Sequence, residues 1–470
     1  METLQRTANR GSISTGAYEI DNSCKFESDN REYLRWTNFS TYASSARKKK
    51  FSMSLWCKRT ELGSQQIIWS TQSNGYLSFE ADDEIKWYQT YSGVQKQLNT
   101  NRVFRDTSAW YNIIVAVDST QATEANRMRL YVNGVEETSF VTATYPSQND
   151  EAQNIYEQHL YLGEWGGGSD GFNGYIADYL FVSEVQLVPS DVGEYDGDSG
   201  IWKPKAYSGT ISAPSHFLEF QDGSDLGTAT SGLDADTMNN IAAADQATDT
   251  PTNNFCIANA IAIGSSNLFQ FTEGGTVCKR ITADQWDFFT TTMPVNKGKW
   301  YGEFKIGSGP AMVGIGSLSY FEGIAQSSHT GAGMATNSGV AYYGADGKRW
   351  VDNTEAAYGA TFGTSDIISI AMDLDNDNVY FAKNGTWQNS GDPTSGATGT
   401  GALSTDPVGD YFVMTMNMLY NPTTHFMNYG GYTTISISSA AADANGYGTF
   451  EFAPPTGFYA LCTKNLAEYG

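Results

Sequence analysis

Positive charge is scarce in this chain. Its 470 residues include 28 lysines and arginines against 52 aspartates and glutamates, which gives a formal net charge of −24 at pH 7. Charged residues of both signs make up only 17% of the chain, compared with about 25% in an average globular protein. A nucleic-acid-binding surface has to be basic to displace the counterions of the phosphate backbone. The composition therefore argues against nucleic acid as a partner, and it also disfavours anionic membrane surfaces.

Cysteine and histidine are few, and neither is spaced as a metal or redox motif requires. The five cysteines contain no CxxC pair, which excludes a zinc knuckle and a redox dithiol. The four histidines are far apart and form neither HxxxH nor HExxH. No run approaches the ~20 apolar residues that span a bilayer, and the N-terminus lacks the apolar core of a signal peptide. We therefore expect synthesis in a reducing cytoplasm and no membrane insertion.

Long segments with helical spacing of apolar residues are missing too, whereas strand patterns are frequent. The clearest runs from 366 to 385, where Ile368, Ile370 and Met372 alternate with smaller or polar residues. Four polar residues at 375–378 supply a turn before the alternation resumes. Burial at every second residue on both sides of a short turn predicts a β-hairpin with one face on a core.

The first half of the chain carries the same signal. Alternating stretches occupy 51–57, 110–118, 128–132 and 174–182. Cys57 lies on the apolar side of the first stretch, so we expect it to be a small buried hydrophobe. Short strands separated by turns rich in glycine, asparagine and serine indicate antiparallel sandwiches.

A polar stretch divides the chain, which is too long for one ordinary core. Residues 233–253 are rich in Ala, Asp, Thr and Asn and contain Pro251, which favours an extended course. Since little of this stretch can be buried, it is predicted to be a linker. The sequence thus predicts an all-β protein with two antiparallel β-sandwiches in four segments: an N-terminal arm (1–16), a first sandwich (17–232), the linker (233–253) and a second sandwich (254–470).

Several motifs of the second half follow one another in the order of a known domain. They are Trp300-Tyr301-Gly302-Glu303-Phe304, Val313-Gly314-Ile315-Gly316, the hairpin ending in Asn384-Gly385, and Asn428-Tyr429-Gly430. Together they resemble a SPRY domain, which usually has Asn-Phe-Gly at the last position. The segment 454–466 looks like the ending of SPRY domains in bacteriophage structural proteins. The resemblance covers roughly 254–466 and implies a sandwich whose exposed face and loops bind partners.

The first half has its own ordered motifs. They are Phe51-Ser52-Met53-Ser54-Leu55-Trp56, the stretch 110–118, Leu130-Tyr131-Val132-Asn133-Gly134, Phe172-Asn173-Gly174-Tyr175-Ile176-Ala177-Asp178, and Phe217-Leu218-Glu219-Phe220 with Asp225-Leu226-Gly227. This series resembles the laminin-G-like branch of the concanavalin A-like lectin/glucanase superfamily, from about residue 17 to 231.

The order of the two domains resembles virion-associated proteins of tailed bacteriophages. That resemblance implies a non-enzymatic tail-fibre, head-fibre or spike subunit on the surface of the particle, with a host-surface glycan or protein as ligand. Other virion proteins are the implied partners, and a homotrimer is the default assembly for fibres. A purely structural particle protein without a host ligand is the main alternative, and a polysaccharide-degrading enzyme is a further one.

Two loops are candidate ligand sites. A glycine-rich loop places Trp165 and Asp170 between two predicted strands, where a ring could stack on a sugar and a carboxylate could accept its hydroxyls. In the second half, Tyr342, Tyr343, Asp346 and Trp350 flank a Gly-Ala-Asp-Gly turn. Packing of these aromatic rings onto the sandwich core is the competing interpretation for both loops.

No catalytic residue is predicted. Glu80, Asp82 and Glu84 have the two-residue spacing of a glycosidase strand, but they lie where two strands meet in a turn, which would splay the carboxylates apart. The GxSxG pattern at 167–171 precedes a strand, whereas a nucleophile elbow precedes a helix.

No cofactor is predicted. Asp373, Asp375 and Asp377 mimic the first ligands of a calcium loop, yet a hairpin turn explains them better. The acidic composition would permit Ca²⁺, but the sequence assigns no ligands.

Overall fold

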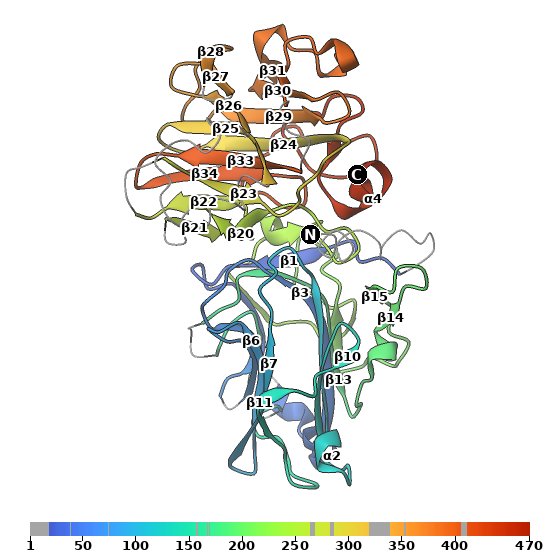
Figure 1. Ribbon diagram of the computed structural model, residues 1–470. Coiled ribbons are helices and arrows are strands. Elements are labelled where there is room, and N and C mark those ends of the chain that lie inside the picture. Colours follow the sequence, from blue (N-terminus) through green and yellow to red (C-terminus); the bar gives the residue numbers. More distant parts are fainter. Residues whose placement is uncertain are drawn as a thin grey trace. The chain divides into compact units, whose positions relative to one another are not determined.

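The protein consists of two compact units, Met1–Asn253 and Asn254–Gly470. The structure is a computed structural model that describes residues 18–37, 39–73, 75–156, 158–166, 168, 170–263, 268–282, 286–318, 339–351, 354–405 and 411–470. Each unit contains two large β-sheets (Figure 1), so the predicted all-β fold with two antiparallel sandwiches is confirmed. The predicted N-terminal arm, 1–16, lies outside the described residues. Within them, no helix is long and apolar enough to cross a membrane.

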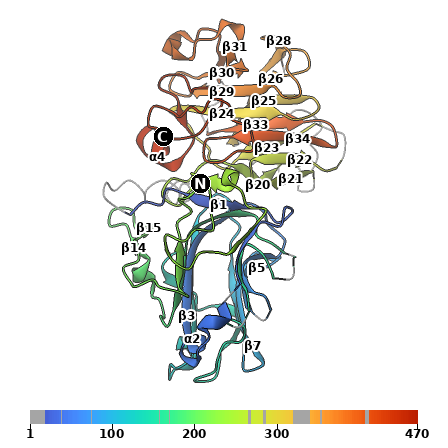
Figure 2. The same ribbon diagram turned by 180° about the vertical axis from the view of Figure 1, so that it is seen from behind.

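The first unit pairs a nine-stranded sheet with an eight-stranded sheet, which form separate layers in Figures 1 and 2. The nine-stranded sheet has the order β10 (Val135–Glu136), β9 (Met128–Val132), β8 (Tyr111–Asp118), β3 (Lys50–Arg59), β13 (Gly174–Ser183), β1 (Ser23–Phe26), β19 (Gln246–Ala247), with β16 (His216–Leu218) and β17 (Ser231–Gly232) beside β13. The eight-stranded sheet has the order β11 (Phe140–Thr144), β7 (Val94–Val103), β6 (Glu84–Tyr91), β5 (Gly75–Phe79), β4 (Gln66–Thr71), β12 (Leu160–Leu162), β2 (Tyr33–Trp36), β18 (Thr237–Asn239). A separate ribbon joins β14 (Gly193–Tyr195) to β15 (Trp202–Pro204).

The core of the first unit lies between these sheets and is rich in aromatic rings. Trp69 and Trp87 of the eight-stranded sheet lie 5.6 Å apart, and Phe51 of the opposite sheet lies 6.4 Å from Trp87. Cys57 is fully buried in this core, as predicted. All five cysteines lie in the described part of the chain, are buried, and form no disulfide bond.

The nine-stranded sheet is also covered on its outer face. Ile114, Leu180 and Val182 point outward from this sheet and pack against the segment 184–215. The Trp202 indole of that segment donates a hydrogen bond to Asn112 Oδ1 at 3.1 Å. This sheet is therefore buried on both faces.

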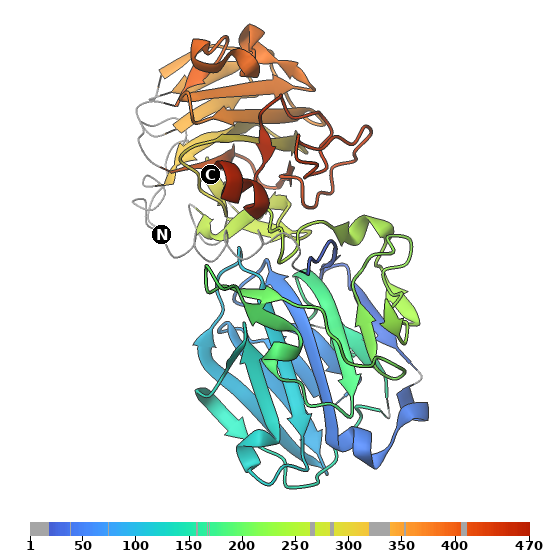
Figure 3. The ribbon, with the colours of Figure 1, turned by 90° about the vertical axis from the view of Figure 1, so that its right-hand side faces the viewer.

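The predicted linker, 233–253, is part of the first unit, so the expectation that it stays exposed is wrong. Its strands β18 and β19 pair with β2 and β1, and Figure 3 shows the segment in yellow-green along the sandwich. Asp249 is fully buried, accepts a hydrogen bond from the Trp110 indole and lies 2.7 Å from the buried Lys58 ammonium. Polar residues can be buried when opposite charges compensate them, and composition does not reveal such pairs.

A second buried cation holds the same segment. Lys25 Nζ lies 2.9 Å from Glu32 and 3.0 Å from Asp245, and its side chain is 1% exposed. Burial, opposed by Lys25, raises the pKa of Glu32 to about 7. We call 233–253 the anchored segment.

The second unit pairs a seven-stranded sheet with a nine-stranded sheet. The first has the order β20 (Ala258–Ile263), β23 (Asp287–Thr291), β33 (Phe412–Met418), β25 (Ala311–Ser317), β26 (Gly339–Tyr343), β27 (Lys348–Val351), β28 (Thr354–Ala357). The second has the order β21 (Phe269–Thr272), β22 (Val277–Arg280), β34 (Thr423–Asn428), β24 (Lys299–Ile306), β29 (Ile367–Asp373), β30 (Asn378–Lys383), β31 (Thr386–Trp387), with β32 (Leu403–Ser404) on β30 and β35 (Tyr459–Ala460) parallel to β24.

The hairpin predicted at 366–385 is confirmed as β29 and β30, which close on the pair Asp373 and Asn378. Ile368, Ile370 and Met372 are fully buried in the core. The opposite face of β29 is buried as well, because Ala371 packs with Phe450, Phe458 and other residues of the C-terminal part of the chain. The sequence predicted only one buried face.

A buried carboxylate fastens the C-terminal part of the chain to this sheet. Glu303 accepts hydrogen bonds from the backbone N–H groups of Glu451 and Phe452, at 3.0 and 2.8 Å, and from Asn428 Nδ2 at 3.1 Å. Burial raises the pKa of Glu303, and these hydrogen bonds oppose the shift.

The α-helices described are short: α2 (Ser45–Lys49) and α4 (Thr463–Tyr469). The basic run at 47–50 belongs to α2 and the start of β3. Two of its charges are in ion pairs, Arg47 with Glu184 at 3.2 Å and Lys50 with Asp118 at 2.9 Å.

Removing the Asp249 carboxylate should destabilise the first unit. Asp249→Ala leaves the buried Lys58 ammonium without its 2.7 Å partner, and breaking a buried pair on one side costs about 3–5 kcal/mol. Urea unfolding measures the loss. Asp234→Ala, which alters an exposed carboxylate of the same segment, should change stability by less than about 1 kcal/mol. Equal losses in the two variants would contradict the anchoring role.

Acid should destabilise the first unit through His216. The imidazole is fully buried among the rings of Trp36, Phe39, Tyr179 and Phe181, and its Nδ1 donates to the Pro214 carbonyl. Burial lowers the pKa of His216 to about 3. Because an unfolded histidine titrates near 6.5, only the unfolded chain gains this proton between about pH 6.5 and 3, and stability falls as the pH falls.

The variant His216→Phe keeps a ring and removes this titration. Its unfolding free energy relative to wild type should rise by about 1.4 kcal/mol for each pH unit below 6.5. Urea unfolding at pH 8, 6 and 5 measures the difference. If the unfolding free energies of the variant and the wild type fell equally with pH, His216 would not be held neutral in the folded protein.

Candidate functional site

The eight-stranded sheet of the first unit has an outer face that the rest of the unit covers only in part. The strand register aligns five outward side chains in one row across β6, β5, β4, β12 and β2: Tyr88, Tyr76, Ser70, Tyr161 and Arg35. Their neighbours in sequence, including Trp87, Leu77 and Trp69, point into the core. The alternation that builds the sandwich therefore also sets three tyrosines on the outer face of the sheet, of which Tyr76 and Tyr88 are half-buried and Tyr161 is buried.

Three half-buried rings on this face, Tyr76, Tyr88 and Trp165, form what we call the aromatic platform. Tyr76 and Tyr88 stack with ring centroids 4.9 Å apart and an interplanar angle of 21°. Trp165 meets Tyr76 edge-on, at 5.3 Å and 80°. Offset stacking and edge-to-face contact are the favoured arrangements of aromatic pairs, so each ring holds its neighbour in place.

The loop after β12 positions Trp165. The buried Glu164 carboxylate lies 2.9 Å from Arg31 Nε, and the Glu164 carbonyl accepts a hydrogen bond from Ser70 Oγ at 2.8 Å. A Cβ atom on Gly166 would come within 2.6 Å of the Gln72 backbone. Only glycine allows so close an approach, so the loop lies tightly on β4 and carries Trp165 over Tyr76.

The side chains around the platform are polar, and their charges are balanced. Lys86 Nζ lies 5.5 Å from the centre of the Tyr76 ring and 3.8 Å from Glu80. Partial burial lowers the pKa of Lys86, but the Tyr76 hydroxyl and the Glu80 carboxylate together raise it above its ordinary value. Gln97 and Asn99 of β7 lie opposite Tyr88 and Lys86 and are half-exposed. The surface thus offers aromatic rings beside amide donors and acceptors.

Asp170, predicted to act with Trp165, lies elsewhere. Its carbonyl accepts the Ile67 N–H at 2.6 Å, near the start of β4, whereas the loop that carries Trp165 approaches Gln72, just beyond the other end of that strand. Five residues separate Ile67 from Gln72, which is roughly 16 Å along a strand. The structure therefore separates the two predicted ligand residues. Gly167 and Ser169, between them, lie outside the described residues.

Tyr342, predicted as a ligand residue in the second unit, does not fit that role. It is fully buried, packs against Tyr358 and Phe362 at 5.3 and 4.8 Å, and donates its hydroxyl hydrogen to the Ala360 carbonyl. Its position on β26 points it into the core, which is the competing interpretation given above.

The other three predicted residues of this unit remain accessible. Tyr343 meets Trp286 edge-on at 5.6 Å, and both share a small cluster with Trp350. Asp346 is exposed, and its carboxylate lies 3.3 Å from Lys348 Nζ. Burial, followed by the negative charge of Asp346, raises the pKa of Tyr343. The structure brings Tyr343 and Trp350 into one cluster on β26 and β27, and Asp346 lies in the turn between these strands.

Family models match both units. Residues 30–191 match the concanavalin A-like lectin/glucanases superfamily, and residues 299–404 match the SPRY domain. The chain contains a concanavalin A-like domain followed by a SPRY domain. The aromatic platform belongs to the first domain, and Tyr343, Trp350 and Asp346 belong to the second.

Comparison with solved structures gives further SPRY domains. The chain is similar to the SPRY domain of human HERC1, with 13% identity and a TM-score of 0.28, covering 36% of this chain and 96% of that one. It is also similar to another human SPRY domain, with 16% identity and a TM-score of 0.26, covering 34% and 94%. No curated protein matches the chain.

The acidic triple of the concanavalin A-like domain lies in a turn, as predicted. Glu80 and Glu84 flank the turn between β5 and β6, where the Glu80 N–H binds the Glu84 carbonyl at 2.9 Å. Asn99 Nδ2 donates to Glu84 at 2.6 Å, and Asp82 is exposed. The fourth carboxylate, Asp83, is buried in ion pairs with Arg59 and Arg105, at 3.0 and 2.8 Å. The three carboxylates do not share one strand, and the absence of catalysis stays a prediction.

The calcium-like run in the SPRY domain is a hairpin turn. Asp373 accepts from Asn376 Nδ2 and lies 2.8 Å from Lys299 Nζ, and Asp375 accepts from the Gly298 N–H at 2.9 Å. Within the described part of the chain, no group of three or more His, Cys, Asp or Glu side chains is arranged to hold a metal ion. Calcium binding elsewhere stays untested.

Sequence reasoning found one member of the platform and missed two. Trp165 stood out because it lies in a glycine-rich loop. Tyr76 and Tyr88 are ordinary members of strands, and no loop or motif marks them as candidate ligand residues. A signal was present in β6, where Lys86 and Tyr88 alternate with the buried Ile85 and Trp87.

Proposed function

We propose that the protein is a non-enzymatic binding protein whose concanavalin A-like domain holds a glycan on the aromatic platform. The supporting observation is the contact of three half-buried rings on the outer face of a sheet, beside amide side chains. The apolar C–H faces of a sugar stack on such rings, while its hydroxyls bond to amides. Because the rings already hold one another, little side-chain entropy is lost on binding.

An uncharged glycan suits this surface best. The chain carries a net charge of −24, which repels polyanions over a distance of about a Debye length. The nearest cation, Lys86, is already beside Glu80. We therefore propose a neutral polysaccharide of a cell surface as the ligand.

We further propose that the protein is an exposed fibre or spike subunit on the virion of a tailed bacteriophage. This role is supported by the order of the two domains and the SPRY ending at 454–466, which resemble such proteins. In this role the platform contacts the host surface, other virion proteins are the partners, and the assembly is a homotrimer. The half-exposed rings of Tyr343 and Trp350 suit a protein partner, since interfaces are enriched in aromatic residues. A particle protein without a host ligand is the alternative.

Loss of one platform ring should weaken glycan binding with little effect on folding. For Trp165→Ala and Tyr88→Ala we expect about tenfold weaker binding, which corresponds to about 1.4 kcal/mol. The probes are maltohexaose, cellohexaose, laminarihexaose and mannohexaose, with a heparin hexasaccharide as the anionic comparison, and calorimetry measures the affinity. The melting temperature should change little, because Trp165 is half-buried.

Tyr195→Ala is the matched control, since Tyr195 is 52% exposed and lies on β14, away from the platform. It should bind as wild type does. Equal weakening in all three variants, or tighter binding of heparin than of every neutral probe, would contradict the platform. Release of reducing sugar that Glu80→Gln abolishes would favour the enzyme alternative.

Antibodies raised against the SPRY domain should block attachment of particles that carry this protein. A coat of antibody on an exposed subunit covers the surface that meets the host, and an adsorption assay measures the fraction of particles left free. Antibodies against an internal particle protein serve as the control. Normal adsorption of particles visibly coated in electron micrographs would favour the purely structural role.

A further inference from the structure

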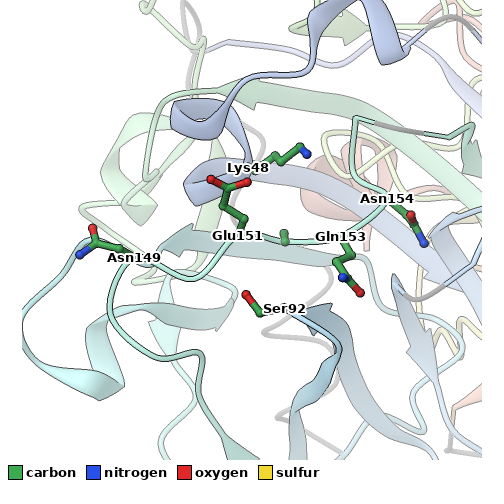
Figure 4. A pocket seen from close by; sticks show the side chains of 7 residues that line it. Lys48, Ser92, Asn149, Glu151, Gln153 and Asn154 are labelled. Atoms are coloured by element: carbon green, nitrogen blue, oxygen red, sulfur yellow. The ribbon is translucent and has the colours of Figure 1, made fainter.

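A polar pocket lies at the end of the concanavalin A-like domain, beside the turn that joins β6 to β7. Its volume is about 470 Å³, which is within the usual range for small-ligand sites. Figure 4 shows the side chains around it, with Lys48 and Glu151 above Ser92 and Gln153 in that view. The lining residues are Lys48, Ser92, Asn149, Glu151, Ala152, Gln153 and Asn154.

The wall of the pocket is fixed by backbone hydrogen bonds to three separate elements. The N–H groups of Asn149, Ala152 and Gln153 donate to the carbonyls of Ser119, Lys48 and Thr90, at 2.8, 3.0 and 2.8 Å. These partners follow β8, belong to α2 and lie in β6. The pocket is therefore formed before any ligand arrives, which lowers the cost of binding.

The same wall is tied to the two strands that carry the tyrosines of the platform. Gln89, which follows Tyr88 in β6, donates its side-chain amide to the Gln153 carbonyl at 2.6 Å. Asn154 Nδ2 donates to the Ser73 carbonyl at 3.1 Å, just before β5. Four residues along the chain separate Tyr88 from Ser92, roughly 13 Å at the rise of a strand. A bound oligosaccharide is long enough to reach from one to the other.

The chemistry of the pocket fits an uncharged, hydroxyl-rich group. It offers one ammonium, one carboxylate, three amides and one hydroxyl, from Lys48, Glu151, Asn149, Gln153, Asn154 and Ser92. The two formal charges cancel, so neither an anion nor a cation is favoured. The lining therefore contains both hydrogen-bond donors and acceptors, as the hydroxyls of a sugar require, and among the described residues no aromatic side chain lines the pocket.

We propose that this pocket binds the terminal sugar residue of a neutral glycan whose preceding residues stack on the aromatic platform. The inference rests on the proposed function and adds that the protein recognises chain ends. The inner side of the pocket is formed by the buried Ala152 and by backbone that is hydrogen-bonded to Lys48 and Thr90, and the interior of a glycan chain would have to pass over this side. A chain end does not have to pass over it.

Paired variants test the pocket. Lys48→Met and Gln153→Ala should each weaken binding of the best neutral hexasaccharide at least fivefold in calorimetry. Their controls, Lys49→Met in the same helix and Gln148→Ala in the same loop, change residues that do not line the pocket. The controls should stay within twofold of wild type.

Stoichiometry gives a second readout. With polysaccharides of the same sugar and increasing length, the number of protein molecules bound per chain should stay constant, because the number of ends does. A number that grows with length would overturn end recognition. Pocket variants that bind like wild type while Trp165→Ala binds poorly would overturn the pocket alone. A wild-type protein that binds none of the probes would overturn both the pocket and the proposed function.

Discussion

The buried ion pair between Lys58 and Asp249 decides which face of the first domain meets solvent. Through this pair, and the Lys25 contacts with Glu32 and Asp245, the anchored segment closes over the end of the nine-stranded sheet. The segment 184–215 covers the rest of that outer face. With one sheet buried on both sides, the half-buried rings of the aromatic platform lie on the outer face of the other, eight-stranded sheet.

The sequence predicted the sandwiches well because their signal is local. Alternation at 51–57 and at 366–385 reports burial residue by residue, and both stretches became central strands. The prediction of an exposed linker at the anchored segment was wrong for the opposite reason. Its aspartates look solvated in composition, and their partners Lys25 and Lys58 lie about two hundred residues earlier in the chain. Pairing at that distance leaves no trace in a window of neighbouring residues.

The candidate site shows the same division between local and distant information. Trp165 was identified from its loop, but its role depends on Tyr76 and Tyr88, which only strand pairing brings beneath it. Asp170 is close to Trp165 in sequence, yet it is held at the other end of β4 by the Ile67 N–H. In the second unit, Tyr342 and Tyr343 are adjacent, and the pleat of β26 sends one into the core and leaves the other half-exposed.

The first domain begins and ends on neighbouring strands. Ser23 and Cys24 of β1 pair with Ala247 and Gln246 of β19, and Thr252 bonds to the backbone of Ile20. A force applied through the two ends of this domain would therefore act on the short antiparallel pairing of β1 with β19 at the edge of the sheet. The strands that carry the aromatic platform lie in the other sheet, outside that line of force. A force transmitted along the polypeptide would therefore leave the arrangement of Tyr76, Tyr88 and Trp165 unchanged.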